Sequence, residues 1–210
     1  MEPTQTRQLE TVIWDLETTG FVAPECKILE IGAFLVNDIG EVTKKHWVLD
    51  NKVEIPQNII EITGITPAII VEEGRDPEEC LLEFLKYLTR AKKNVTHNGV
   101  KFDIPFLVAT VVDVLKYTDE QKKDLEEFLR LTAFDTAARF KADKLGTVQY
   151  PDENFGEFAE RVMSQKVFGL KFNLGVCCDH YGIDRSNIVQ HRALGDVELT
   201  HALFNKYFEK

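Results

Sequence analysis

Five residues in three distant segments of the chain have side chains suited to holding divalent cations and moving a proton. Asp15 and Glu17 lie in VIWDLETTG, Asp103 lies in THNGVKFDIPFL, and His191 and Asp196 lie in QHRALGDVELT. Carboxylates that crowd together repel each other unless a cation lies between them. If these segments converge, four carboxylates and a histidine would form a site able to cleave phosphodiester bonds with bound metal ions.

The spacing of Asp15 and Glu17 places both carboxylates on one face of a strand, because side chains alternate along a strand. Trp14 and Leu16 then point to the opposite, packed face. Acidic pairs of this kind are common in a chain with 35 acidic residues, and most are solvated surface. The apolar approach TVIW indicates a buried strand that leads up to this pair, which favours a chemical role.

Asp196 lies in a predicted helix, 193–208, on the same stripe as Thr200, Leu203 and Tyr207. This stripe faces inward, and a buried carboxylate needs a cation or hydrogen-bond donors to remain charged. Two readings stay open on the residues alone. Asp196 binds a cation, or it caps the helix or bonds to a threonine.

His191 and Asp103 occupy positions next to predicted helices. His191 precedes the helix at 193–208 on a loop, from which an imidazole can reach over a metal site and act as a general base near neutral pH. Asp103 begins another helix, where capping is the simpler interpretation and does not exclude metal binding. His97 and Asn98 end a short strand, where open α/β sheets tend to place their ligands.

The elements that must position these residues follow from hydrophobic periodicity and turn signals. Pro56 and Gly64 bracket one short helix, and Thr66-Pro67 begins another. The second strand is almost continuously apolar apart from Glu30, as in a strand covered on both faces. We expect an α/β fold, a ribonuclease-H-like mixed five-stranded sheet flanked by helices. The expected strands are 11–16, 27–36, 43–50 (at an edge), 94–99 and 131–135; the remaining expected helices are 77–91, 103–130, 157–167, 172–181 and 193–208, with a loop at 141–157 and Asp135 as a helix cap.

Length and composition are those of one globular domain over 1–210, with a core of about 11–206. The chain has 210 residues, of which 44% are hydrophobic and 29% charged. The N-terminus MEPTQTRQLE is polar and no apolar run approaches a membrane span, so we expect neither a secretory signal nor a membrane anchor. The four cysteines show no CxxC spacing, which argues against a zinc site. They favour the cytoplasm or another reducing intracellular compartment.

The net charge of −10 is unusual for a protein that grips long duplex nucleic acid, since such proteins show a basic face. Only short basic patches occur, such as Lys44–Lys45 and Lys92–Lys93. Two bound divalent cations would offset part of the local repulsion. The charge therefore favours binding of a short strand end over movement along a duplex.

The three segments resemble the motifs of the DEDDh group of 3′–5′ exonucleases, the DnaQ-like proteins that include the proofreading epsilon subunit of bacterial DNA polymerase III. The first motif is similar to IWDLETTG, followed by LEIGAF at 29–34, the second to THNGVKFDIPFL and the third to HRALGDVELTHALF. The family's His-Gly-Ile element corresponds to Thr63-Gly64-Ile65, with threonine in place of histidine. The resemblance covers residues 11–206.

The resemblance implies a role for each matching residue. Asp15, Glu17 and Asp196 would bind two Mg²⁺ or Mn²⁺ ions directly, Asp103 would complete the metal site partly through water, and His191 would be the general base. An oxygen-rich site without thiolate suits these ions. The residues implied to contact the terminal nucleotide are Leu16, Thr18, Thr19, Ile65, Asn98, Phe102 and His191.

The implied activity is a two-metal 3′–5′ exonuclease that releases nucleoside 5′-monophosphates from single-stranded or frayed 3′ ends, with DNA somewhat favoured over RNA. Its expected partners are nucleic acid and a polymerase or other replication or repair protein, with no membrane. Three alternatives stay open: an exoribonuclease of the same family, a non-catalytic polymerase-associated scaffold with this fold, and a ribonuclease-H-like endonuclease. The histidine before the last aspartate and the Asp-Leu-Glu-Thr-Thr motif argue against the endonuclease.

Overall fold

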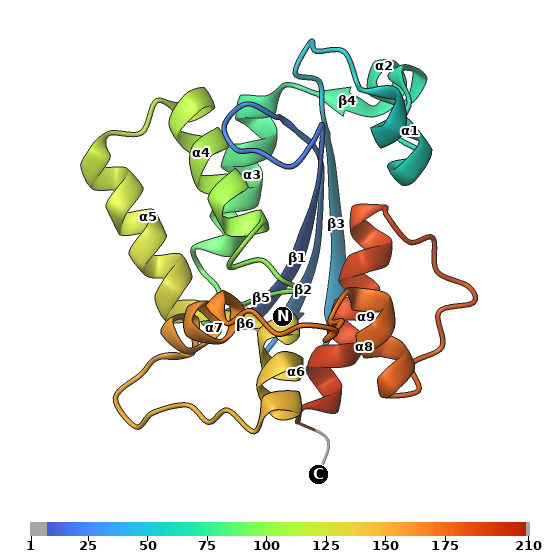
Figure 1. Ribbon diagram of the computed structural model, residues 1–210. Helices are drawn as coiled ribbons and strands as arrows, with labels where there is room; N and C mark the ends of the chain where they lie inside the picture. Colours follow the sequence, from blue (N-terminus) through green and yellow to red (C-terminus); the bar gives the residue numbers. More distant parts are fainter. Residues whose placement is uncertain (1–7, 209–210) are drawn as a thin grey trace, which may run out of the picture.

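A computed structural model describes residues 8–208, which contain a six-stranded mixed sheet in the order β4-β3-β2-β1-β5-β6 (Figure 1). β2 runs antiparallel to β1 and β3, whereas β5 runs parallel to β1 and to β6. The α/β class and the mixed sheet are confirmed. The strands are β1 (Leu9–Thr18), β2 (Ile28–Asn37), β3 (Val42–Leu49), β4 (Gly74–Arg75), β5 (Lys93–Thr96) and β6 (Ala133–Asp135).

The expected count of five strands is wrong, because β4 pairs in parallel with the end of β3 at Val48 and Leu49. β4 is only two residues long, too short to produce a period in the sequence. The expectation that β3 forms the sheet edge therefore holds for its first half and fails where β4 covers it.

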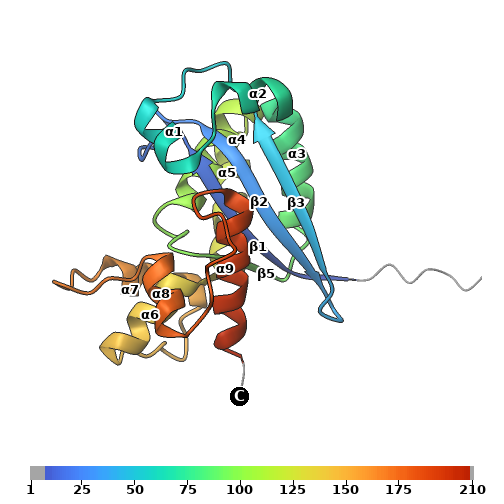
Figure 2. The same ribbon diagram turned by 90° about the vertical axis from the view of Figure 1, so that its right-hand side faces the viewer.

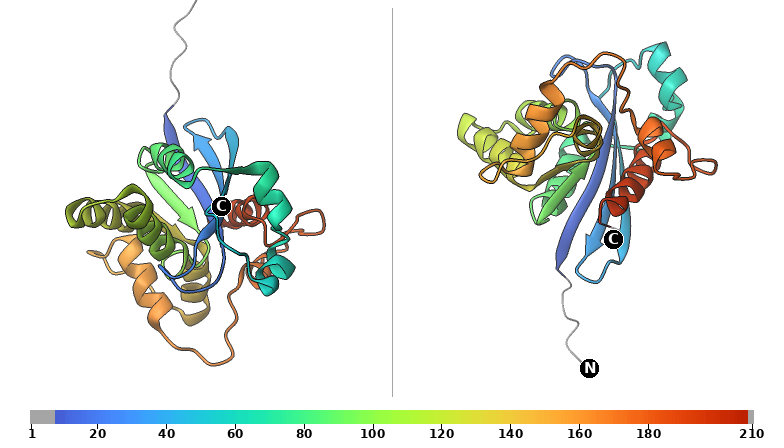
Figure 3. Two further views of the ribbon diagram at one scale, coloured as in Figure 1. Left: turned by 90° about the horizontal axis from the view of Figure 1, so that it is seen from above. Right: turned by 60° about the horizontal axis from the view of Figure 1, so that its bottom comes forward.

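Helices cover both faces of the sheet. Figures 1 and 3 show α3 (Pro77–Leu88), α4 (Asp103–Leu115) and α5 (Asp119–Thr132) on one side, and α9 (Ala193–Lys206) along the other. In Figure 2, α9 stands in front of the long strands β1 and β2, with which it packs. The other helices are α1 (Gln57–Thr63), α2 (Pro67–Glu73), α6 (Thr136–Leu145), α7 (Phe155–Ser164) and α8 (Leu174–His180).

Alternation along β1 divides its side chains between two cores, as its sequence predicts. Trp14 and Leu16 are buried in the core beneath α3 and α4, whereas Ile13 packs in a second core with Val197 of α9. Side chains two residues apart share a face. Asp15 therefore points to the same face of the sheet as Ile13, toward α9. An acidic residue on the facing side of α9 would lie close to Asp15.

The loop expected at 141–157 is shorter, because α6 extends to Leu145 and α7 begins at Phe155. Asp135 caps α6 as predicted, since its Oδ1 accepts a hydrogen bond from the backbone N–H of Ala138 at 3.0 Å. The end of α6 and the start of α7 lie in a mainly polar stretch, so hydrophobic periodicity does not indicate these boundaries. Gly64 ends α1 with a φ of 70°, the left-handed cap that its position predicts.

The N-terminal residues 1–7, on which the expected absence of a signal sequence partly rests, lie outside the described range. Between residues 8 and 208, no helix combines the length and the apolar character that a membrane crossing requires. The four cysteines, all within this range, carry free thiols. Cys177 and Cys178 are both buried, in agreement with the expectation that at least one of them would be.

Candidate active site

The acidic residues of the first and third motifs converge on the face of the sheet covered by α9. Ligand oxygens of Asp15, Glu17 and Asp196 lie within 4.8 Å of one another. Asp15 and Glu17 come from the end of β1, and Asp196 comes from the first turn of α9. For these three carboxylates the convergence expected from the sequence is present, over a separation of about 180 residues along the chain.

Asp103 lies next to this cluster and is held by β1 itself. Its Oδ1 accepts a hydrogen bond from the backbone N–H of Leu16 at 3.1 Å, and its side chain is buried. The expectation that Asp103 is an N-cap is wrong, because Phe102 occupies the cap position and Asp103 is the first residue of α4. Its carboxylate bonds to a strand residue 87 positions earlier in the chain, in addition to its own backbone N–H.

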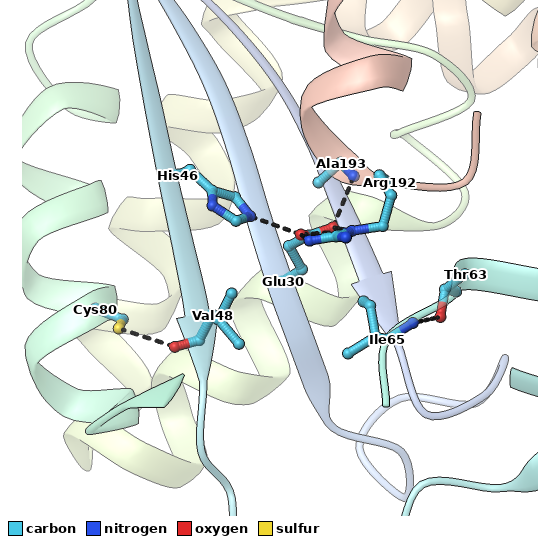
Figure 4. A network of polar contacts seen from close by, with 8 residues as sticks. All are labelled: Glu30, His46, Val48, Thr63, Ile65, Cys80, Arg192 and Ala193. Atoms are coloured by element: carbon cyan, nitrogen blue, oxygen red, sulfur yellow. Dashed lines mark hydrogen bonds and ion pairs between the residues drawn. The ribbon is translucent and has the colours of Figure 1, made fainter. Parts of the chain in front are cut away.

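Glu30 fixes the start of α9 against the sheet (Figure 4). Its carboxylate accepts hydrogen bonds from the Nε (2.9 Å) and Nη2 (2.5 Å) of Arg192 and from the backbone N–H of Ala193 (2.8 Å), and it contacts Nε2 of His46 at 2.6 Å. Arg192 lies between His191 and Asp196 in the third motif. Glu30 therefore determines where both of these residues stand.

The hydrogen bonds to the Glu30 carboxylate outweigh the effect of burial on its pKa. Burial alone would raise the pKa of this carboxyl, but the hydrogen bonds from His46, Arg192 and Ala193 lower it to about 2. The side chain is 1% exposed. A buried charge is tolerated only when it is paired and hydrogen-bonded, as here. The sequence indicated that Glu30 is unusual, because it is an acidic residue inside an otherwise apolar strand.

Gly32 allows α9 to approach the sheet closely. It pairs with Asp15 in the β1–β2 ladder. A Cβ at this position would lie 2.6 Å from the carbonyl carbon of Ala193 and 2.7 Å from the amide nitrogen of Leu194. Only a residue without a side chain fits there, so the backbone at the start of α9 can lie directly beside Asp15.

Electrostatic crowding characterises the cluster. Burial, followed by the negative charges of Asp103, Glu17 and Asp196, raises the pKa of Asp15 well above its ordinary value. Burial and the same kind of repulsion raise the pKa of Glu17 to about 8, and burial raises the pKa of Asp103 to about 7. Carboxylates placed in this way ionise fully only when cations balance them. An all-oxygen donor set fits Mg²⁺ or Mn²⁺.

His191 is exposed and lies in a left-handed backbone conformation, with a φ of 58°. Its backbone N–H donates to Oδ2 of Asp196 at 3.3 Å, which leaves the imidazole outside this contact. The alternative reading of Asp196 is not observed, because the buried hydroxyl of Thr200 has no hydrogen-bond partner among the described residues. Asp196 also does not cap α9, whose cap residue is Arg192.

The turn that precedes Asp103 is held by Asp135. This buried carboxylate accepts hydrogen bonds from the backbone N–H groups of Asn98 (3.0 Å) and Val100 (3.1 Å) in addition to that of Ala138. Asn98 adopts a φ of 64° in this turn and is half-buried. Asp135 thus joins the second motif to the start of α6, a role beyond the helix cap that its sequence position predicts.

The residues implied to contact a nucleotide lie in different environments. Thr18 and Thr19 use their hydroxyls to bond Gly20 O and Lys27 N–H. Leu16 and Ile65 are buried in apolar clusters, so contact between either side chain and a base would require movement.

Phe102 is half-buried in the second motif and contacts Phe21, an aromatic residue that was not identified from the sequence. The Phe102 ring lies 6.3 Å from the ring of Phe21, which is 75% exposed. Phe21 follows directly after the first motif, in the segment DLETTGF. It therefore adds an exposed aromatic surface where the first two motifs meet.

Comparison with known proteins agrees with this geometry. The family model RNase_T, described as "Exonuclease", matches residues 12–204. The chain is 29% identical over 202 residues to a DNA polymerase III PolC-type protein of Clostridium perfringens, covering 96% of this chain and 11% of that protein. It is 28% identical over 202 residues to the DNA polymerase III subunit epsilon of Aquifex aeolicus, covering 95% of this chain and 80% of that subunit.

Solved structures show the same fold at low identity. E. coli Exonuclease I in complex with a dT13 oligonucleotide superposes with a TM-score of 0.68 and 17% identity, covering 95% of this chain and 41% of that one. The complex of the same enzyme with dA16 gives a TM-score of 0.70 and 18% identity, covering 96% and 43%. The chain therefore spans less than half of Exonuclease I and about a tenth of the PolC-type protein.

Proposed function

This chain belongs to the exonuclease family whose model matches residues 12–204, and from that premise we propose a metal-dependent enzyme that shortens single-stranded or frayed nucleic acid one nucleotide at a time. As a DnaQ-like 3′–5′ exonuclease domain it hydrolyses phosphodiester bonds. The observation that supports the proposed mechanism is the meeting of Asp15, Glu17 and Asp196 within 4.8 Å. We take residues 11–206 as one catalytic domain.

The proposed roles follow from position. Asp15, Glu17 and Asp196 would hold the metal ions, and Asp103, fixed by the Leu16 N–H, would complete the site. When bound, Mg²⁺ or Mn²⁺ would supply Lewis-acid activation of a water molecule and charge neutralisation at the leaving 3′ oxygen.

His191 accepts the proton of the attacking water as general base. A bond from the water oxygen to phosphorus forms while the bond from phosphorus to the 3′ oxygen of the penultimate nucleotide breaks. The leaving 3′ oxygen takes up a proton from solvent water, so that the shortened strand ends in a 3′ hydroxyl, and the nucleoside 5′-monophosphate leaves. The exposure of His191 supports this role, because the ring can turn toward a substrate without disturbing the fold.

DNA is the favoured substrate in this proposal. The two relatives above are DNA polymerase III proteins, and the superposed Exonuclease I structures contain deoxyoligonucleotides. The same relatives suggest a polymerase or another replication or repair protein as partner. The free cysteines are compatible with a reducing intracellular compartment.

The proposal is tested by following mononucleotide release from 3′-labelled single-stranded oligonucleotides with Mg²⁺ or Mn²⁺. Asp15→Asn should abolish release, as should a chelator with the unchanged protein. Asp38→Asn, in the exposed turn after β2, is the matched control and should retain full activity. Release by Asp15→Asn, or in the presence of chelator, would overturn the mechanism. Matched RNA oligonucleotides test the substrate. A non-catalytic scaffold would not cleave them and need not bind two Mn²⁺ ions.

A further inference from the structure

We propose that the segment 165–172, between α7 and α8, is a binding surface for the single-stranded nucleic acid that lies upstream of the 3′ end. The inference rests on the proposed exonuclease function and extends it to the path of the strand outside the metal site. In Figure 1 this segment links α7, on the α5 side of the molecule, to α8, on the α9 side.

Both ends of the segment are fixed to the protein. The buried amine of Lys141 donates hydrogen bonds to the carbonyl oxygens of Gln165 (2.5 Å) and Met163 (3.4 Å), and it lies 5.2 Å from the centre of the Phe172 ring. At the other end, the carbonyl oxygen of Phe172 lies 3.0 Å from Nε2 of His97. A segment held in this way presents its central residues in a defined place.

The attachment through His97 places the segment next to the second motif. His97 directly precedes Asn98, and its other ring nitrogen lies 2.9 Å from the hydroxyl of Thr136. Burial lowers the pKa of His97 to about 4, so the ring is neutral and structural. The same turn leads through Lys101 to Asp103. One end of the segment 165–172 therefore contacts the second motif, which also contains Asp103.

The centre of the segment has the chemistry of a single-strand binding surface. Phe168 is fully exposed, the most exposed of the large apolar side chains in the described range, and Lys166 and Lys171 on either side are also exposed. Bases stack on exposed aromatic rings, while lysines contact the phosphates. Lys101, at the near edge of the site, is exposed as well.

Charge distinguishes this surface from the rest of the molecule. The chain carries a net charge of −10, yet residues 161–178 and 84–102 contain no aspartate or glutamate. These two acid-free stretches meet at the His97–Phe172 contact. These two stretches therefore contribute lysines and arginines without acidic side chains of their own, whereas the rest of the chain has more acidic than basic residues. A protein partner would gain little from this arrangement of one aromatic ring between two lysines.

The test compares substrates of two lengths. A dinucleotide occupies the metal site alone, whereas a 12-nucleotide single strand also extends over the segment 165–172. Phe168→Ala should lower kcat/KM for the 12-mer roughly 5- to 100-fold, the effect of losing one stacked base. The dinucleotide should be cleaved at the unchanged rate. Phe168→Trp should keep wild-type activity on both, because it preserves an aromatic face.

The lysines are tested through the salt dependence of binding to the 12-mer. Lys166→Gln combined with Lys171→Gln should reduce the slope of log K against log salt by about 1.4, since each phosphate contact on a single strand contributes about 0.7. Lys122→Gln with Lys123→Gln, on α5, is the matched control and should leave the slope unchanged. RNA and DNA 12-mers are compared in parallel.

Equal kcat/KM of Phe168→Ala and wild type on the 12-mer, or an equal salt slope for the Lys166/Lys171 variant, would overturn the proposal. Failure of the exonuclease assignment would look different, because both substrates would then resist cleavage by the unchanged protein.

Discussion

Replacing Glu30 by glutamine should loosen the start of α9 and weaken metal binding although Glu30 is not a proposed ligand. The substitution keeps the size of the side chain and removes its charge. It leaves the Arg192 guanidinium, which is 27% exposed, without its charged partner. Since Arg192 stands between His191 and Asp196, both of these residues lose their fixed position. The protein should remain folded, with a less well-defined metal site.

The size of the effect follows from the pKa of Glu30, which is about 2 in the folded protein against an ordinary value of 4.5. This difference corresponds to about 3 kcal/mol of stability from the ionised form. A depressed pKa contributes stability above the unfolded value and loses it as the pH falls through the folded value. The difference between wild type and Glu30→Gln should therefore be about 3 kcal/mol at pH 7 and about half of that near pH 3.

Urea unfolding between pH 7 and pH 3 measures this difference, and titration with Mn²⁺ measures the site. A loss of 3 kcal/mol corresponds to a Tm lower by roughly 6–12 °C for a domain of this size. Metal affinity or activity should fall about 10- to 100-fold, as for residues that orient metal ligands. Glu54→Gln, at an exposed position, is the matched control. Equal stability and equal Mn²⁺ affinity of Glu30→Gln and wild type would refute this reasoning.

Two further substitutions test the crowding of the cluster and the close approach of α9. Burial and neighbouring carboxylates raise the pKa of Glu17 to about 8. The contribution of Glu17 to stability is present below about pH 4.5 and is lost as the pH rises through 8. In chelator-treated protein, Glu17→Gln should therefore remove roughly 4 kcal/mol of the decline in stability between pH 5 and pH 9, measured by urea unfolding. Gly32→Ala should lower stability by about 1–3 kcal/mol through the clash with Ala193, measured by thermal unfolding; an unchanged Tm would contradict the close approach.

Local periodicity was sufficient to predict the placement of three acidic residues, Asp15, Glu17 and Asp196. The shared face of Asp15 and Glu17 and the packed positions of Trp14 and Leu16 follow from strand alternation alone. The inward position of Asp196 follows from helical periodicity. These predictions succeed because each concerns residues within one strand or helix, where the backbone geometry determines the relative directions of the side chains.

Contacts between distant parts of the chain could not be predicted in the same way. Glu30 was recognised as an interruption in an apolar strand, but its partner Arg192 lies 162 residues away. Asp103 was assigned to its own helix because capping is a local rule, whereas its actual donor is the N–H of Leu16. The two residues of β4 pair with the end of β3, about 26 residues earlier in the chain. In each case tertiary packing supplies the partner, and no local pattern encodes it.

The pairing of Arg192 with Glu30 also keeps the arginine from forming an ion pair with a carboxylate of the proposed metal site. The positive charge of Arg192 lowers the pKa of Glu17. Because the Nε and Nη2 groups of Arg192 donate to Glu30, Arg192 anchors α9 and leaves Glu17 and Asp196 available to external cations. Loss of the Glu30 charge would therefore weaken metal binding twice, through a displaced Asp196 and through an arginine free to pair with Glu17.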